Sequence, residues 1–121
     1  MSHQTDANAP RITIEAFGPR VRATFNGATV ADSTRALVLR ERGYPPRIYF
    51  PPGDVDMGLL RPTRHTTHCP HKGDAAYWTL RVGDREVENA AWSYPHPIDD
   101  VAAIAGHLSF VDAVAVDPVP A

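Results

Sequence analysis

Proline is the residue that most restricts what this chain can fold into. The sequence contains 12 prolines in 121 residues, which is about twice the average usage. Proline interrupts helices and removes a hydrogen-bond donor from a sheet. Two proline pairs, Pro45-Pro46 and Pro51-Pro52, enclose residues 47–50, so that segment can form only a short strand. The chain is therefore expected to contain many turns and few long helices.

Two hairpins are predicted where turn residues interrupt segments of alternating polarity. Asn26-Gly27 lies within residues 21–31 and is the strongest short hairpin signal, because both central residues of a type I′ turn need a positive φ. Gly83-Asp84 lies in the same way within residues 76–94, where the alternation places Trp78 on the core-facing side. Both segments are expected to form antiparallel strand pairs.

The remaining segments complete a small β domain. Further strands are expected at residues 35–40 and 108–116, and about two turns of helix at 98–105. Residues 53–71 have no clear period and are expected to form the longest loop, where function tends to lie. The predicted fold class is mainly β, a small two-sheet antiparallel sandwich or open barrel with one short helix.

The length of the chain fits one domain. Residues 1–10 and 117–121 are rich in small, polar and proline residues and are expected to be disordered tails, which leaves 11–116 as a single β-rich domain. One cysteine excludes an internal disulfide, and no apolar run approaches the ~20 residues of a membrane helix. Residues 1–10 also lack the apolar stretch of a signal peptide. A cytoplasmic location is therefore expected.

The charges argue against a large polyanionic partner. The formal net charge is −2, so no overall field would attract nucleic acid or an anionic membrane. The expected partner is a small molecule, and the expected state is a monomer or weak homodimer. Six arginines nevertheless lie within residues 20–47, where Asp32 and Glu41 are the only acids. They form either one of two complementary surfaces of the domain or a local anion site.

The densest polar segment, residues 64–73, contains three histidines and Cys69. Zinc would suit such ligands, but neighbouring residues on one loop rarely complete a tetrahedral site, so no metal is expected. Cys69 would act as a nucleophile if His68 or His71 lowered its pKa, with Glu41 or Asp54 orienting the histidine. The alternative is a small buried apolar side chain.

Lys72 is the only lysine, although eleven arginines are present. It would bind a phosphate or carboxylate as a point charge, or serve as an amine if desolvated; the alternative is a solvated turn lysine. The tyrosines and Trp92 would complete a core or line a pocket. The predicted ligand-binding residues are Arg35, Glu41, Tyr49, Asp54, Lys72, Tyr77, Trp92 and Tyr94. The catalytic candidates are Cys69 and Lys72.

Three runs carry a family resemblance: FNGATVADSTRALVLRERGYPPRIYFPPGDV, THCPHKGDAAYW and AAWSYPHP. They resemble the bacterial family known as domain of unknown function 427, over about Arg20 to Phe110. The most specific motifs are the Cys-Pro-x-Lys-Gly segment at Cys69–Gly73, followed by Tyr77 and the Trp92-x-Tyr94 pair.

The resemblance implies a β-tent-like domain, in which two antiparallel sheets are pinned together at one edge with a pocket between them. Relatives of that fold often hold zinc on paired cysteines, which this sequence lacks, so no cofactor is carried over. The family also has a nucleotidyltransferase-like label. Paired metal-binding carboxylates beside a glycine-rich phosphate loop are absent from the sequence, so the residues give that label little support.

Three functions follow from these residues. The first is a domain that binds a small molecule, which is anionic if Lys72 and Arg35 hold it, in a pocket lined by the aromatic residues. The second is an enzyme with Cys69 as nucleophile or with nucleotidyltransferase-like activity. The third is a protein-interaction module that uses exposed aromatic side chains.

Overall fold

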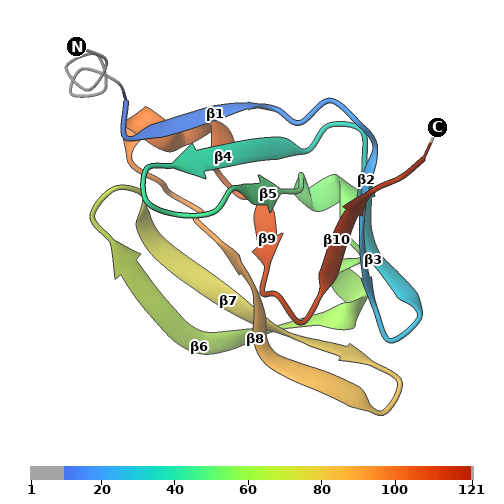
Figure 1. The fold of residues 1–121 in the computed structure, drawn as a ribbon. Helices are drawn as coiled ribbons and strands as arrows, with labels where there is room; N and C mark the ends of the chain where they lie inside the picture. Colours follow the sequence, from blue (N-terminus) through green and yellow to red (C-terminus); the bar gives the residue numbers. More distant parts are fainter. Residues whose placement is uncertain (1–9, 121) are drawn as a thin grey trace.

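Ten strands and three short 3₁₀ helices make up residues 10–120, the part of the chain that the computed structural model describes (Figure 1). The strands are β1 (Ile12–Ala16), β2 (Val21–Phe25), β3 (Ala28–Ser33), β4 (Leu37–Glu41), β5 (Arg47–Tyr49), β6 (Leu60–Cys69), β7 (Gly73–Val82), β8 (Arg85–Ser93), β9 (Leu108–Phe110) and β10 (Ala115–Pro118). The helices are η1 (Pro52–Asp54), η2 (Met57–Leu59) and η3 (Asp99–Ile104). Most of the predicted N-terminal tail, residues 1–9, lies outside the described residues.

The strands form three antiparallel sheets. The first sheet has the order β1-β4-β5, the second β10-β2-β3 and the third β6-β7-β8-β9. The first and third sheets meet where the backbone groups of Phe50 and Leu108 exchange two hydrogen bonds of 2.8 Å, and β5 accordingly lies beside β9 in Figure 1. These two sheets are therefore joined at one edge and open away from it.

Local turn chemistry explains both hairpins. Asn26 and Gly27 have positive φ values of 49° and 81° between paired Phe25 and Ala28, as a type I′ turn requires. In the second hairpin Gly83 has a φ of 61°, and Val82 pairs with Arg85. Both predicted hairpins are confirmed.

The predicted loop at residues 53–71 is largely a strand. It contains η1 and η2 and then the ten residues of β6. Most side chains of β6 are exposed on both of its faces, because it is the outer strand of the third sheet. A strand that buries neither face shows no alternation of apolar and polar residues, so the sequence pattern does not indicate a strand here.

The C-terminal segment also differs from the prediction. Residues 108–116 form two strands in place of one, with β9 in the third sheet and β10 in the second. The predicted tail at 117–121 begins inside β10, since Asp117 and Pro118 pair with Arg22 and Val21. β1 was not predicted, although Ile12, Ile14 and Ala16 alternate with polar residues.

Two clusters of buried side chains lie on the two sides of the third sheet. The larger joins it to the second sheet and includes Phe25, Leu80 and Phe110, with Trp78 packed against it. The smaller joins it to the first sheet and to η3, and includes Tyr49, Tyr94 and Ile104.

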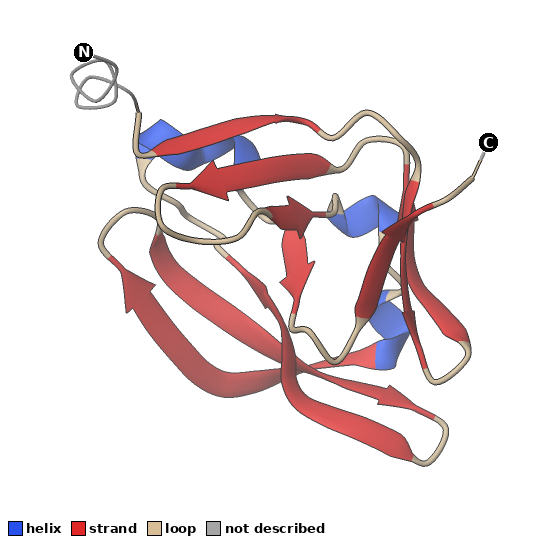
Figure 2. Ribbon diagram, viewed as in Figure 1, coloured by secondary structure: helices blue, strands red, loops and turns tan. Residues whose placement is uncertain are grey.

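Figure 2 shows strands throughout the domain and only short helical segments among them, so the predicted mainly β fold class is confirmed, with three sheets where two were predicted. The single short helix expected at 98–105 corresponds to η3, and η1 and η2 are additional. No helix within residues 10–120 is long and apolar enough to cross a membrane.

Candidate functional site

A cleft of about 550 Å³ lies between the first and third sheets. The turn between β6 and β7 lies on one side of it, and β4, β5, β7 and β8 supply six of its fourteen lining residues. Seven predicted site residues line it: Glu41, Tyr49, Cys69, Lys72, Tyr77, Trp92 and Tyr94. His71, which the sequence suggested only as a base for Cys69, also lines it, and the lining residues that were not predicted are Leu39, Tyr44, Pro45, Arg47, Pro70 and Val111.

Lys72 and Glu41 form a buried ion pair in this cleft. The Lys72 Nζ atom lies 2.5 Å from Glu41 Oε1, and only 12% and 8% of the two side chains are exposed. Taking both charges out of water offsets much of their attraction, so such a pair adds little to stability. The pair is more simply explained by a role in the cleft than by a role in folding.

The backbone around Lys72 is fixed by its neighbours. The Lys72 N–H donates to the Cys69 carbonyl at 3.2 Å, and the Ile98 N–H donates to the Lys72 carbonyl at 3.0 Å. Gly73 has a φ of 116°, and a Cβ atom there would lie 3.4 Å from the His96 carbonyl oxygen. The positive φ favours glycine next to Lys72, and the hydrogen bonds fix the backbone from which the Lys72 side chain extends.

Tyr49 and Trp92 form the inner aromatic wall. The Trp92 Nε1–H donates to the Tyr49 hydroxyl at 3.2 Å, and burial raises the pKa of Tyr49 to about 12. The Arg47 guanidinium lies over the Trp92 ring, 5.5 Å from its centroid, a distance suited to a cation–π contact. The Trp92 ring is therefore fixed at its edge by Tyr49 and on one face by Arg47.

Tyr94 and Tyr77 use their hydroxyls differently. Tyr94 is only 6% exposed, and burial, followed by neighbouring Tyr49 and Cys69, raises its pKa above the ordinary range. No hydrogen-bond partner of the Tyr94 hydroxyl occurs among residues 10–120. The Tyr77 hydroxyl instead contacts Thr67 Oγ1 at 3.0 Å. Tyr94 is thus the phenol whose hydroxyl is available to a bound molecule.

The histidines near Cys69 face different surroundings. His65 packs edge-on against Tyr77, with 4.5 Å between ring centroids. His68 pairs with exposed Asp74 at 2.7 Å, and His71 lines the cleft with Cys69. In the described part of the chain no three His, Cys, Asp or Glu side chains gather closely enough to hold a metal ion, and no hydrogen bond joins Cys69 to a base.

Arg35 and Asp54, which were predicted to bind the ligand, are not lining residues of this cleft. Asp54 accepts hydrogen bonds from Ser33 Oγ at 2.6 Å and from Arg35 Nη2 at 3.2 Å. The Ser33 hydrogen bond, more than Arg35, lowers the pKa of Asp54. The two residues therefore join the end of β3 to η1.

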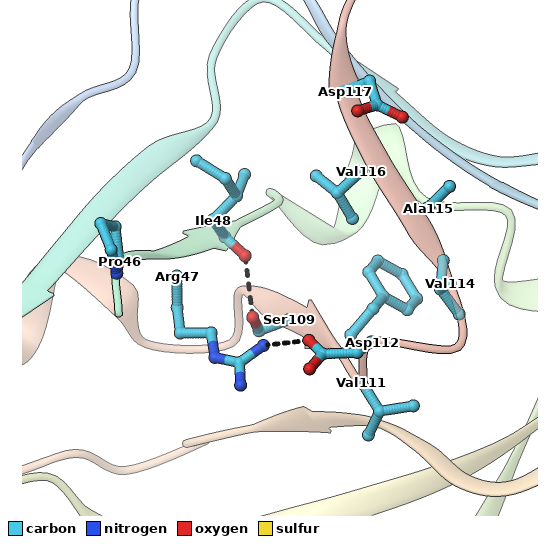
Figure 3. A pocket seen from close by; sticks show the side chains of 11 residues that line it. Pro46, Arg47, Ile48, Ser109, Val111, Asp112, Val114, Ala115, Val116 and Asp117 are labelled. Atoms are coloured by element: carbon cyan, nitrogen blue, oxygen red, sulfur yellow. Dashed lines mark hydrogen bonds and ion pairs between the residues drawn. The ribbon is translucent and has the colours of Figure 1, made fainter. Parts of the chain in front are cut away.

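A smaller hollow of about 340 Å³ lies between β5, β9 and β10, and Figure 3 shows its side chains. Arg47 Nη1 lies 3.1 Å from Asp112 Oδ1, and Ser109 Oγ donates to the Ile48 carbonyl at 2.8 Å. These polar groups already have protein partners, and Val114 and Val116 supply apolar wall. Arg47 also lines the larger cleft, so its side chain separates the two hollows.

Residues 13–119 match the family model described as Domain of unknown function (DUF427). The chain belongs to this family, which confirms the resemblance carried by its three sequence runs. No curated protein matches the chain.

Proposed function

We propose that this DUF427 family member binds a small, flat molecule with an anionic or hydrogen-bond-accepting group in the cleft between the first and third sheets. The observation that carries the proposal is the buried Lys72–Glu41 pair, placed among Tyr49, Trp92 and Tyr94. The aromatic side chains would hold the body of the ligand, and Lys72 would bind its polar group.

The size and lining of the cleft support this function. Its volume of about 550 Å³ falls within the roughly 300–1,000 Å³ of small-molecule sites. Such sites combine apolar and aromatic walls with a few fixed polar groups. Here those polar groups are Lys72, Glu41 and the Tyr94 hydroxyl.

The charges support an anionic or electron-rich group. An ammonium has three N–H donors, and Glu41 accepts from Lys72 through one oxygen, which leaves donors for a ligand. Arg47 adds a second cation at the wall, and its own partner Asp112 belongs to the smaller hollow and is 92% exposed. Glu41 is the only acid that lines the cleft among the described residues.

The same observations favour binding over the alternatives. Nucleotidyl transfer commonly uses paired carboxylates to hold metal ions, whereas this cleft presents one carboxylate that is already bonded to Lys72. The proposal places the domain in a bacterial cytoplasm, in keeping with its single cysteine. It excludes nucleic acid and membranes as partners, in keeping with the net charge of −2.

A thermal-shift screen tests this function with AMP, a sugar phosphate, benzoate and inorganic phosphate as probes. The test variant is Lys72→Met combined with Glu41→Gln, which removes both charges and leaves neither one buried alone. The matched control is Arg35→Met, which breaks the exposed pair with Asp54 outside the cleft.

At least one probe is expected to raise the melting temperature of the wild type and of Arg35→Met, because binding to the folded state stabilises it by mass action. The shift should vanish in the double variant. An equal shift in all three proteins, or none with any probe, would contradict the proposal.

A further inference from the structure

We infer that Lys72 forms a Schiff base with the carbonyl group of a small aldehyde or ketone bound in the cleft, with Glu41 accepting and returning the proton. This inference rests on the proposed binding function and specifies the class of molecule that the cleft takes.

The choice of lysine at this position is the first argument. The chain has twelve lysine and arginine side chains. Eleven of them are arginines, and the single lysine lies in the cleft. An arginine would hold an anion equally well, and with two hydrogen bonds. Only an amine can add to a carbonyl and form an imine, and lysine is the side chain that proteins use for this. Lys72 is thus suited to a reaction that arginine cannot perform.

The position of Glu41 is the second argument. An ammonium must lose a proton before its nitrogen can attack a carbonyl. Glu41 Oε1 lies 2.5 Å from Lys72 Nζ and can take that proton directly. Only 12% and 8% of the two side chains are exposed, so the proton can pass between them with little competition from water.

The steps balance without an added reagent. The Lys72 ammonium gives one proton to Glu41, and the free amine then adds to the carbonyl carbon. The carbonyl π bond breaks, and one N–H proton passes from the nitrogen to the oxygen, which gives a neutral carbinolamine. Glu41 then returns its proton to the carbinolamine oxygen, which leaves as water while the carbon–nitrogen double bond forms. The products are a protonated imine on Lys72, a Glu41 carboxylate and one water molecule.

Tyr94 supplies the third group. Its hydroxyl lines the same cleft and has no partner among residues 10–120. A tyrosine hydroxyl is protonated at neutral pH, and burial raises the pKa of Tyr94 further, so the hydroxyl can donate to the carbonyl oxygen. An amine, a carboxylate and a phenolic donor therefore share one aromatic cleft.

Reductive trapping tests the inference. The native protein is incubated at neutral pH with para-formylbenzoate and cyanoborohydride, and the modified residues are identified by peptide mass spectrometry. The reference is the α-amino group of the same chain. In an unfolded chain at pH 7 a lysine offers roughly 200-fold less free amine than the α-amino group, given ordinary pKa values of about 10.4 and 8.

The native protein is expected to carry more adduct at Lys72 than at its α-amino group, and the preference should reverse in urea. The variant Lys72→Arg keeps a cation beside Glu41 and, once its circular dichroism shows that it is folded, should carry the adduct only at the α-amino group. A native protein that labels no more at Lys72 than the unfolded chain would overturn the inference.

A second variant tests Glu41 itself. Glu41→Gln preserves the shape of the side chain but cannot exchange a proton, and it is expected to slow labelling of Lys72 by about 100-fold. Labelling as fast as in the wild type, or faster, would mean that Glu41 only holds Lys72 protonated, and would overturn its assigned role.

A non-reacting analogue separates this inference from the proposed function. Para-(hydroxymethyl)benzoate has the same outline as the aldehyde but no carbonyl to trap. If it raises the melting temperature while the aldehyde leaves Lys72 unmodified, the Schiff base is refuted and binding stands. If neither compound acts on the native protein, both are refuted for this class of molecule.

Discussion

Two groups of paired charges, one buried and one exposed, show how the same residue types serve different ends in this domain. The buried pair is Lys72–Glu41, in which 12% and 8% of the side chains are exposed. The exposed cluster consists of Arg20, Arg22 and Asp32 on β2, β3 and the turn before them, where the exposed fractions are 51%, 37% and 26%.

The exposed cluster is explained by local geometry. Arg20 donates to both oxygens of Asp32 at 2.8 Å, and Arg22 adds a hydrogen bond at 3.1 Å. These contacts, with Arg20 the largest contributor, hold the pKa of Asp32 at about 2. The cluster remains hydrated, and its ion pairs link neighbouring strands.

The cleft is governed by burial. There desolvation raises the pKa of Tyr49 to about 12 and also raises the pKa of Tyr94. Polar groups kept in such surroundings are expensive to maintain. The proposed ligand binding would account for their presence in the cleft, whereas the exposed cluster is explained by the fold alone.

The largest expected effect comes from breaking the buried pair on one side only. Glu41→Gln or Lys72→Met should each destabilise the domain by about 3–5 kcal/mol, because each leaves an uncompensated buried charge. The double variant Lys72→Met/Glu41→Gln should lose much less. Urea unfolding of the four proteins measures this as a double-mutant cycle.

The exposed cluster supplies the control for that cycle. Arg20→Met leaves Asp32 in contact with water and with Arg22, so its effect should be far smaller than that of Lys72→Met. If the two single variants were equally destabilising, the contrast between the regions would be wrong.

The next effect concerns the glycine that presents Lys72. Gly73→Ala should destabilise the domain by about 1–3 kcal/mol, because a side chain at a φ of 116° is strained and its Cβ would touch the His96 carbonyl oxygen, so it has little room to relax. Gly27→Ala is the matched control, since Gly27 also has a positive φ but open space around it. Urea unfolding measures the loss in the free energy of unfolding. Equal losses in the two variants would show that the surroundings of Gly73 add nothing to the effect of its positive φ.

Alkaline pH should weaken the cleft. Tyr49 has an ordinary pKa of 10.0 that rises to about 12 in the folded state, so the unfolded chain ionises first. The stabilisation is complete below pH 10 and is lost as the pH rises through 12. Ultraviolet titration should show a late phenolate signal that is smaller in Tyr49→Phe; an unchanged titration would contradict burial of this hydroxyl.

Acid should weaken the exposed cluster, by a smaller amount because water screens it. Asp32 has an ordinary pKa of 3.8 that falls to about 2 in the folded state, so its stabilisation is present above pH 3.8 and is lost as the pH falls through 2. Urea unfolding at a series of pH values should show this loss in the wild type and not in Asp32→Asn. If the free energy of unfolding changed with pH in the same way in both proteins, the stabilising role assigned to the cluster would be wrong.

The features that could be predicted from the sequence depend on local chemistry. The two hairpins followed from Asn26-Gly27 and Gly83-Asp84, whose turn conformations need few tertiary contacts. The motif residues Cys69, Lys72, Tyr77, Trp92 and Tyr94 were predicted as site residues, and they line one cleft. A single lysine and paired aromatic residues stand out in any chain, which is why these positions could be singled out from the sequence.

The features that could not be predicted depend on which strands become neighbours. Arg35 and Asp54 have the charges of a binding site. In the structure, however, Asp54 accepts hydrogen bonds from Ser33 and Arg35, and both residues lie at the end of β3, outside the cleft. Arg47 reaches the cleft only because β5 joins β9 and brings its side chain over Trp92. The hydrophobic periodicity of one segment does not indicate which other strand that segment will lie beside.

The central claim, that the cleft binds a small molecule beside Lys72, is tested most directly by the two indole N–H signals in an NMR titration with para-(hydroxymethyl)benzoate. The chain has two tryptophans: Trp92 lines the cleft and donates to Tyr49, whereas Trp78 packs against the larger core cluster. Binding in the cleft predicts a saturable shift of the Trp92 signal in the wild type, a fixed Trp78 signal, and no shift in Lys72→Met/Glu41→Gln. A Trp92 signal that stays fixed, or a shift confined to Trp78, would contradict the account.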